Sequence, residues 1–499
     1  MQSAELYDVI ITGCGPVGAT LANLLVQQGL SVAVVEREAA VFPLARAGHF
    51  DAEVMRVFQS IGVASEVEAA TDVTLGMRFL DADGAMLMEW RRGGEKGPNG
   101  WISDYMFFQP AVERILRARL AASPKVRMFL SHDVFAVRDV GDHAEVQAEN
   151  IAEAKLVTFR GKYVVGCDGA RSLVRRTIGA EHENLGFKQR WLVIDVLQKH
   201  DLGLERISTQ HCNPERPMYA TCIANGMLRW EIMLKPEDDA AYVTTHDAIW
   251  NFIESSVRPI SRHDGEIHRG VVYTFESLIT ETWRKGRLMV AGDSAHRTPP
   301  FLGQGMCAGI RDASNLAWKI AAVCNGVASD SLLDTYESER RPHVKTFIEG
   351  AVEVGKFVQM DDRVKMAEIV RDMRANPKAY APPNPPLGPG LNRDHGSALL
   401  GRQVVQPQVH GQLLDEHIGH AFAVIATESF ATSEAAFSRL KSTHPTVKFI
   451  EVPEEVAAFL EPYGSPAIVV RPDRYVHAAL ANGTELARVL DGLPVLKVS

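Results

Sequence analysis

A carboxylate beside a glycine-rich loop is the most informative chemical feature of the sequence. The apolar run 288–291 leads into Gly292 and Asp293, and an apolar-periodic segment begins near Met306. The loop between them contains Pro299, Pro300, Gly303 and Gly305. A carboxylate at a strand end can accept hydrogen bonds from a polyol, and glycines let backbone N–H groups approach a ligand. The helix N-terminus adds about half a positive charge directed at any ligand over the loop, and an electron-rich ring there could gain anionic character.

An ordinary strand-to-helix turn would give the same local pattern. The glycines would then serve tight packing, and Asp293 would be a common turn residue. Other parts of the chain must therefore decide between a ligand site and a plain turn.

The N-terminal segment carries the pattern of a dinucleotide site. An apolar strand over 7–12 is followed by the glycine pattern, a helix and a second strand over 30–35. The pattern consists of Gly13, Gly15, Pro16, Val17 and Gly18. Its glycines permit a tight turn and the approach of a pyrophosphate to the helix N-terminus. Glu36, followed by Arg37, ends the second strand near the expected place for a carboxylate that binds a ribose. The glycine pattern is a weak signal alone and a strong one in this context.

A third acidic turn follows the apolar strand 163–167. Asp168 and Gly169 end this strand, and Asp168 or Ser172 is predicted to cap a short helix. A second strand that ends in an acid–glycine pair implies a discontinuous cofactor domain. Arg46 is either a solvated cation or a phosphate contact, and Gln109 precedes a predicted helix over 111–120.

The region 187–273 changes to apparent strands around one helix, which is typical of an antiparallel sheet. Such a sheet is a platform for a small-molecule pocket. The candidates for lining it are Arg190, His211, Tyr219, Trp230 and Pro300, and for each of them a core or surface role is the alternative.

Composition excludes several classes of function. The chain has 499 residues, a net charge of −9 and no basic run, which disfavours nucleic acid as a partner. Its six cysteines include no CxxC pair, which favours a reduced, cytoplasmic protein. No apolar run reaches the roughly 18 residues of a membrane span, no signal peptide is predicted, and no metal site is expected.

A linker and a third unit follow the central region. An amphipathic helical region is predicted to continue past Pro342 to Met373, and 381–390 is rich in adjacent prolines and glycines. Beyond it, three predicted strands and two helices form a unit of about a hundred residues.

Taken together, the three motifs resemble the FAD-dependent aromatic hydroxylases with a p-hydroxybenzoate hydroxylase fold. This resemblance implies an α/β protein with a discontinuous Rossmann-like FAD-binding domain, an antiparallel-sheet substrate domain and a C-terminal thioredoxin-like domain. The expected domains are 1–75, 103–186 and 280–345 for FAD; 76–102 and 187–279 for substrate; 346–390 as a helical region and linker; and 391–499 as the thioredoxin-like domain without CxxC.

Three further stretches, 341–355, 401–407 and 470–476, look like those of 3-(3-hydroxyphenyl)propionate hydroxylases. The resemblance implies that NADH or NADPH reduces FAD, that O₂ gives a flavin C4a-hydroperoxide, and that a phenol becomes a catechol-type product. Other phenols, a heteroaromatic or polyketide ring, and a non-catalytic flavoprotein that binds an aromatic ligand stay open. The resemblance is also compatible with a homodimer.

The resemblance also assigns roles to residues. Glu36 would bind the adenosine ribose, Arg46 and Gln109 the FAD phosphates or linker, and Asp293 the ribityl hydroxyls. Asp168 would lie where flavin and nicotinamide sites adjoin, and the amides of 303–306 would face the flavin pyrimidine edge. No motif names a catalytic base, so none is assigned.

Overall fold

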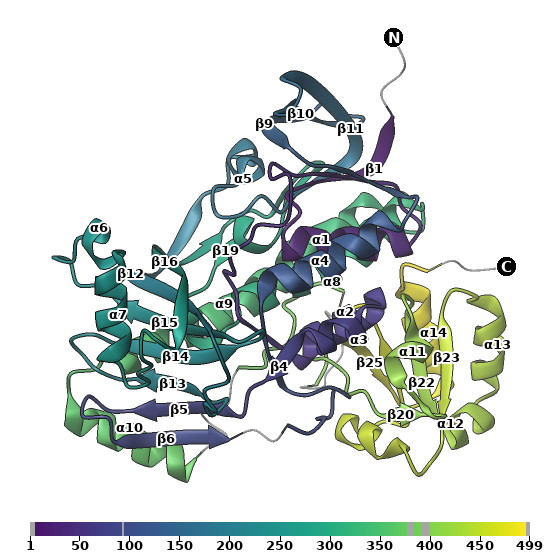
Figure 1. The fold of residues 1–499 in the computed structure, drawn as a ribbon. Helices are drawn as coiled ribbons and strands as arrows, with labels where there is room; N and C mark the ends of the chain where they lie inside the picture. The colour runs from purple at the N-terminus through teal and green to yellow at the C-terminus, as the bar shows by residue number, and fades with distance from the viewer. Residues whose placement is uncertain (1–4, 92–93, 377–382, 392–398, 496–499) are drawn as a thin grey trace.

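Two eight-stranded sheets and a smaller C-terminal sheet organise the chain in the computed structural model (Figure 1). The structure describes residues 5–91, 94–376, 383–391 and 399–495. The N-terminal strand lies at one end of the molecule and the C-terminal unit at another (Figure 1).

The first sheet is parallel at its centre. Its strand order is β17-β18-β11-β1-β2-β8, with β9 and β10 added through β11. The bounds are β1 Leu6–Thr12, β2 Val32–Val35, β8 Val126–Phe129, β9 His132–Asp139, β10 Ala144–Asn150, β11 Lys155–Gly166, β17 Arg284–Lys285 and β18 Leu288–Val290. β1 and β2 read as apolar runs because strands of a parallel sheet are buried on both faces. Helices α1 (Pro16–Gln27), α4 (Gln109–Ala121) and α8 (Gly305–Cys324) pack side by side against it (Figure 1).

The second sheet is mostly antiparallel, with the order β19-β16-β12-β15-β14-β13-β5-β6. The bounds are β5 Gly76–Leu80, β6 Met86–Arg91, β12 His182–Gln198, β13 Ser208–His211, β14 Met218–Ile223, β15 Met227–Met233, β16 Gly265–Thr280 and β19 His296–Arg297. Helices α6 (Ala240–Val243) and α7 (His246–Glu254) lie on one face, where Trp230 and Trp250 belong to an apolar core. The opposite face packs in part against α9 (Asp334–Val358) and α10 (Arg363–Ala375) and contributes side chains to a cavity.

Shorter elements connect the two sheets. β3 (His49–Asp51), β7 (Asp104–Phe107) and β4 (Thr71–Val73) form a small sheet beside α2 (Ala52–Ile61) and α3 (Ala64–Ala69), and α5 spans Leu173–Ile178. The amphipathic region predicted as far as Met373 is two helices, α9 (Asp334–Val358) and α10 (Arg363–Ala375). α9 continues through Pro342, and the side chain of Asp362 caps a new helix by accepting from Lys365 N.

The C-terminal unit is built on the sheet β23-β22-β24-β25. Its strands are β22 Ala423–Thr427, β23 Lys448–Val452, β24 Ala467–Val470 and β25 Val476–Leu480, preceded by the hairpin of β20 (Gln408–Val409) and β21 (Gln412–Leu413). Its helices are α11 Leu414–Ile418, α12 Glu428–Ser433, α13 Ala435–Thr443 and α14 Gly483–Gly492. β22 pairs parallel with β23 and antiparallel with β24. Of the predicted linker, residues 383–390 form neither helix nor strand, and 381–382 lie outside the described residues.

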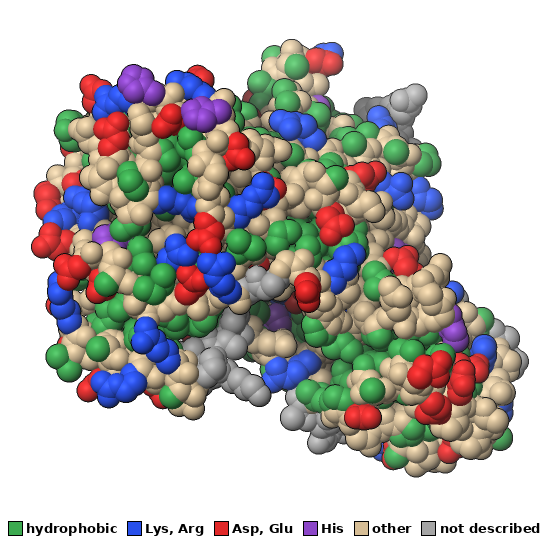
Figure 2. All heavy atoms as spheres, turned by 60° about the horizontal axis from the view of Figure 1, so that its bottom comes forward, with side chains coloured by type: hydrophobic (Ala, Val, Ile, Leu, Met, Phe, Trp, Pro, Cys, Tyr) green, Lys and Arg blue, Asp and Glu red, His purple; other side chains and the backbone are tan. Residues whose placement is uncertain are grey.

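The surface carries mixed charge. Figure 2 shows Lys and Arg side chains interspersed with Asp and Glu over one face of the molecule, in keeping with the net charge of −9. In the described part of the chain, no helix is long and apolar enough to span a membrane.

Candidate active site

A cavity of about 1040 Å³ lies between the two large sheets. Residues from the glycine pattern, the segment 46–53, the second sheet, the loop 298–306 and α9 all line it. Pockets for small ligands reach roughly 1,000 Å³ at their largest. The cavity therefore has room for part of a large cofactor and a second small ring.

The three glycines of the N-terminal pattern have different structural roles. A Cβ on Gly13, which has φ +95°, would lie 2.4 Å from the Cys167 carbonyl oxygen, and one on Gly18 would lie 2.1 Å from the Gly13 oxygen. A Cβ on Gly15 would meet no heavy atom of the described residues within 4 Å, and Gly15 lines the cavity with Pro16 and Val17. Packing thus requires the outer glycines, whereas the middle one leaves open space for a ligand.

Charged side chains surround this glycine turn. The Glu36 carboxylate accepts from the backbone N–H of Cys14 at 2.6 Å, and Arg117 Nε donates to the Cys14 carbonyl at 3.1 Å. Arg117 Nη1 is buried with no hydrogen-bond partner among the described residues. A buried guanidinium nitrogen beside a glycine turn suits an anionic group such as a pyrophosphate. Arg37 is exposed and pairs with Glu38 outside the cavity.

Gln109 positions the segment that carries Arg46. Its Oε1 accepts from the backbone N–H groups of Arg46 at 2.9 Å and Ala47 at 2.8 Å, and its Nε2 donates to Glu113 at 2.6 Å. Burial raises the pKa of Glu113, and Arg117 and Arg46 oppose that rise. Arg46 therefore lies near Arg117, at the end of the cavity that holds the glycine turn.

Asp293 and Asp168 have contrasting environments. Asp293 is exposed to the cavity, and no hydrogen-bond donor from the described residues reaches its carboxylate. Asp168 instead accepts from the backbone N–H of Leu173 at 2.7 Å and from Ser294 Oγ at 3.0 Å. Asp168 thus connects the turn after β11 to the turn after β18, and Gly169, not Asp168, lines the cavity.

In the loop after Asp293, as in the N-terminal turn, one glycine is required by packing and another borders open space. Gly303 has φ +64°, and a Cβ there would lie 2.7 Å from His49 Nδ1. Among the described residues, a Cβ on Gly305 would meet only Thr298 Cβ, at 3.9 Å. Pro300 and Met306 line the cavity with both glycines, while Pro299 and Gly292 are buried outside its lining.

The second sheet gives the cavity a polar wall. The lining side chains alternate along the strands, as the period of two requires. They are Ser208 and Gln210 on β13, Tyr219 and Thr221 on β14, and Arg229 and Glu231 on β15. Of these six residues, the sequence indicates only Tyr219 as a pocket candidate; the candidate Pro300 lines the cavity from the loop 298–306.

Three of the predicted pocket residues lie elsewhere. Trp230 stands between two cavity-facing residues and so points to the opposite face, where its Nε1 donates to Arg258 O at 3.3 Å. Arg190 donates to backbone carbonyls near Asp238, and His211 contacts the carbonyl of Ala82. None of these three side chains lines the cavity as the structure describes it.

A buried ion-pair ladder underlies this wall. Asp195, fully buried on β12, pairs with Arg229 at 2.7 Å and with Arg269 at 2.7 Å. Arg229 also donates to the Ala45 carbonyl at 2.7 Å, which fixes the segment before Arg46. The ladder was missed in the sequence, although charges at 229 and 231 in an otherwise apolar strand indicate one polar face.

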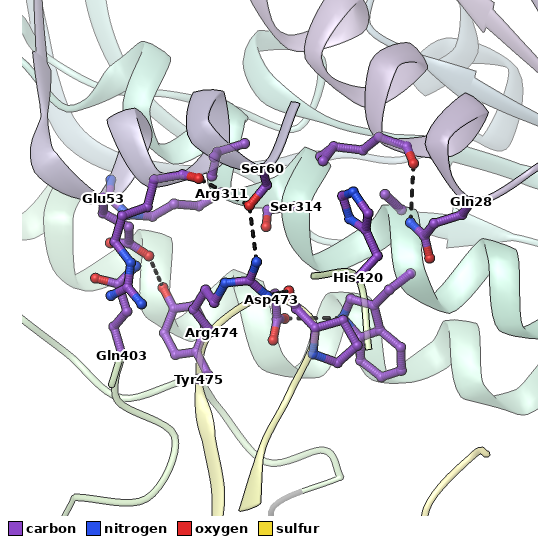
Figure 3. Close-up of a pocket in the computed structure, with 16 residues that line it drawn as sticks. Gln28, Glu53, Ser60, Arg311, Ser314, Gln403, His420, Asp473, Arg474 and Tyr475 are labelled. Carbon is purple, nitrogen blue, oxygen red and sulfur yellow. Dashed lines mark hydrogen bonds and ion pairs between the residues drawn. The ribbon is translucent and has the colours of Figure 1, made fainter. Parts of the chain in front are cut away.

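The far end of the cavity is closed by α9 and by the start of the C-terminal unit. His343 and Phe347 of α9 line it, together with Gln403 and Val405. Tyr475 donates to Glu53 at 2.6 Å, beside a small pocket at the seam between α2, α8 and the C-terminal unit (Figure 3). Glu53 accepts in turn from Arg311 at 2.5 Å.

A buried ion cluster reinforces that seam. Glu339 of α9 accepts from Lys319 of α8 at 2.7 Å and from Arg471 at 2.7 Å, and Arg471 pairs with Asp473 at 2.7 Å. All four side chains are buried, so charges from α8 and α9 compensate charges from the C-terminal unit.

Comparison with known proteins identifies the class. The model of the FAD binding domain family matches residues 6–351, and the chain belongs to this family of flavin-dependent aromatic hydroxylases. A "Probable NADH-specific resorcinol 4-hydroxylase" of Rhodococcus jostii (strain RHA1) is 35% identical, over 97% of this chain and 94% of that protein. A "3-(3-hydroxy-phenyl)propionate/3-hydroxycinnamic acid hydroxylase 2" of Burkholderia vietnamiensis (strain G4 / LMG 22486) is 30% identical, over 94% and 93%.

Solved structures share the fold. Aklavinone-11 hydroxylase, in a ternary complex with FAD and aklavinone, has a TM-score of 0.81 at 23% identity and covers 98% of this chain and 100% of its own. The flavin-dependent monooxygenase PieE, in complex with FAD and substrate, has a TM-score of 0.81 at 18% identity, with coverage of 98% and 100%.

The site fits FAD, the cofactor of this family. Three features suit a dinucleotide that carries a polyol and an electron-rich ring. They are the open space over Gly15 and Gly305, the exposed Asp293 carboxylate, and Arg117 Nη1, which has no hydrogen-bond partner in the described part of the chain. FAD, when bound, supplies the electron transfer and O₂ activation of a monooxygenase. In the part of the chain that the structure describes, no group of three His, Cys, Asp or Glu side chains forms a metal site.

Proposed function

We propose that this enzyme hydroxylates a small phenol that carries no carboxylate, of the resorcinol type, next to its hydroxyl group, with NADH as the electron donor. The 35% identity to a protein named as an NADH-specific resorcinol 4-hydroxylase supports this choice. The 30% identical relatives make a 3-hydroxyphenylpropionate-like acid the second candidate.

The charge inventory of the cavity carries the proposal. Its described lining contains the cations Arg46, Arg229 and Arg311, the histidines His49 and His343, and five carboxylates from Asp51, Glu53, Asp104, Glu231 and Asp293. His49 is paired with Asp104 at 2.9 Å. Arg229 is paired with Asp195, and Arg311 is paired with Asp51 at 2.6 Å and with Glu53. Arg46 lies at the glycine-turn end. Among the described lining residues, a substrate carboxylate away from the glycine turn would therefore meet no unpaired arginine to compensate its desolvation.

The chain's own residues orient this chemistry. Glu36, Arg46, Arg117 and Gln109 would hold the dinucleotide, Asp293 its ribityl hydroxyls, and the amides of 303–306 the pyrimidine edge of its ring. Tyr219 and Gln210 would face the phenol from the sheet. Burial between the sheets would exclude water from the reacting ring.

The domain division stays a proposal, supported by which strands share each sheet. The C-terminal unit has a parallel strand pair joined by helices, then an antiparallel hairpin and a final helix, which supports a thioredoxin-like fold. The described cysteines end at Cys324, so we propose that this unit carries no dithiol chemistry. A homodimer also stays a prediction.

A substrate panel tests the function. Resorcinol, 3-methylphenol and 3-(3-hydroxyphenyl)propionate would each be added to the FAD-loaded enzyme with NADH. Mass spectrometry would then determine the molecular mass of each product. We expect resorcinol to give a product heavier by one oxygen, with a higher kcat/KM than the acid. A higher kcat/KM for the propionate would overturn the assignment to carboxylate-free phenols, and NADPH in place of NADH tests the donor.

A further inference from the structure

We propose that Glu231 is the catalytic base that takes the proton of the substrate's hydroxyl group; this inference rests on the proposed function above. Its place in the sheet, its unused hydrogen-bonding capacity and its surroundings each support this role.

Glu231 faces the cavity from the middle of the second sheet. It lies on β15, opposite Tyr219 of β14 and Val193 of β12 in the strand register. Its side chain is 12% exposed, and it lines the cavity. The carboxylate is therefore held on a rigid strand and is open to a ligand.

The loop 298–306, which contains Gly303 and Gly305, packs close to Glu231. Phe301 of the loop contacts Trp191 with ring centroids 5.7 Å apart. Trp191 is two residues from Val193 on β12, and Val193 pairs with Glu231. A ring bound over the glycine loop and a phenol hydroxyl at Glu231 would thus share one end of the cavity.

A purely structural role does not account for Glu231. Its nearest cation is Arg229, at 4.0 Å, which is beyond hydrogen-bonding distance. Arg229 already pairs with Asp195, with Nε at 2.7 Å and Nη2 at 3.0 Å from the two carboxylate oxygens. Among the described residues no donor hydrogen-bonds to the Glu231 carboxylate, so its acceptor sites are available to a substrate.

The surroundings tune the basicity of this carboxylate. The titratable and charged groups that face it are Tyr219 on β14, Arg229 on β15, Asp195 on β12 and Arg269 on β16. Burial raises the pKa of Glu231, Asp195 raises it further, and Arg229 and Arg269 oppose the rise. A carboxylate with a raised pKa is a stronger base than an exposed glutamate, which suits proton abstraction from a phenol.

The proton transfer is balanced without any added reagent. The O–H bond of the phenol breaks, its electron pair stays on the oxygen, and the proton forms a new O–H bond on Glu231. The resulting phenolate is richer in electrons at the neighbouring ring carbon, where oxygen is to be added. Tyr219, whose hydroxyl donates to Ser208 Oγ at 3.0 Å, would position the ring from the adjacent strand.

Glu231→Gln tests the role, because the amide keeps the shape and cannot accept a proton. Glu266→Gln, an exposed carboxylate of the same sheet, is the matched control. With the best carboxylate-free phenol from the panel, we expect kcat to fall about a hundredfold or more in Glu231→Gln and to stay unchanged in the control. The wild-type kcat should fall as pH drops through the Glu231 pKa. This decline at low pH, the acid limb of the pH–rate profile, should be absent in the variant.

Two measurements separate proton abstraction from positioning and folding. A fluorinated analogue of that phenol, already ionised at neutral pH, should lose far less rate in Glu231→Gln than its parent. Quenching of intrinsic fluorescence should show that the variant still binds the phenol. Equal losses for both phenols, or an acid limb retained in the variant, would overturn the base assignment. If no carboxylate-free phenol is hydroxylated by the wild type, the proposed function itself fails, which is a separate outcome.

Discussion

The Tyr475 hydroxyl donates a 2.6 Å hydrogen bond to Glu53, a residue that also lines the cavity. Burial keeps the pKa of Tyr475 well above its usual value, so the hydroxyl stays a donor. Because Glu53 also accepts from Arg311, one carboxylate connects the C-terminal unit to the wall of the active site.

Removing this hydroxyl should weaken the seam between the two parts. We expect Tyr475→Phe to lower the free energy of unfolding by about 1.5–3 kcal/mol, because the Glu53 carboxylate loses one of its two donors and keeps only Arg311. Denaturant titration of the FAD-loaded protein measures the loss. Tyr242→Phe, at a side chain that is 63% exposed, should cost close to nothing. Equal stability of the two variants would show that the bond contributes no net stability.

Asp293 should contribute to FAD retention. We expect Asp293→Ala to raise the FAD dissociation constant roughly ten- to hundredfold, because a hydrogen bond to a charged group contributes about 1.5–3 kcal/mol. Equilibrium titration of the apoprotein followed by flavin fluorescence gives the constant. Asp361→Ala, at an exposed site between α9 and α10, is the control. An unchanged constant in Asp293→Ala would remove this residue from the site.

The glycines of the N-terminal turn should separate folding from cofactor binding. Gly15→Ala should leave the unfolding temperature of the apoprotein almost unchanged, because the added Cβ enters open space. It should weaken FAD binding, because that space is where the cofactor would lie. Gly18→Ala should destabilise the apoprotein, because its Cβ would lie 2.1 Å from the Gly13 carbonyl oxygen. Thermal unfolding with and without FAD checks both variants. The opposite order of apoprotein stabilities would contradict the assignment.

His343 should make stability depend on pH. Burial lowers its pKa well below the usual value, with Arg340 and Arg311 adding to the effect, and its Nδ1 accepts from Arg340 at 2.8 Å. As pH falls below about 6.5, the unfolded chain binds a proton that the folded protein does not, so the free energy of unfolding decreases.

Comparison with His343→Gln isolates this contribution. We expect the stability difference between wild type and variant to narrow, by up to about 1.4 kcal/mol per pH unit below pH 6.5. Denaturant titrations at matched FAD concentration between pH 5 and 8 measure it. A difference that does not change with pH would assign the acid sensitivity to other groups.

The sequence predicts the cofactor side of the site better than the substrate side. Glycine turns such as 13–18 are local signals, because backbone geometry and helix N-termini act within a few residues. Which face of a strand lines the pocket depends on its register, because neighbouring side chains point to opposite faces. In β15, Glu231 lines the cavity, and its neighbour Trp230 points to the core on the other face. The break between α9 and α10 contains no proline or glycine, so the sequence gives no strong signal for the end of the first helix. Val405 reaches the cavity through a tertiary contact, which no local sequence pattern predicts.

The buried cluster of Lys319, Glu339, Arg471 and Asp473 also constrains how such hydroxylases can recombine. A chimera that grafts the C-terminal unit of a relative onto this chain would inherit two of the four charges from each parent. If the relative lacks the arginine, Glu339 keeps Lys319 but loses its second cation inside a buried interface, where an uncompensated charge is costly. The C-terminal unit is thus not a portable module, and its evolutionary exchange requires matched changes in α8 and α9.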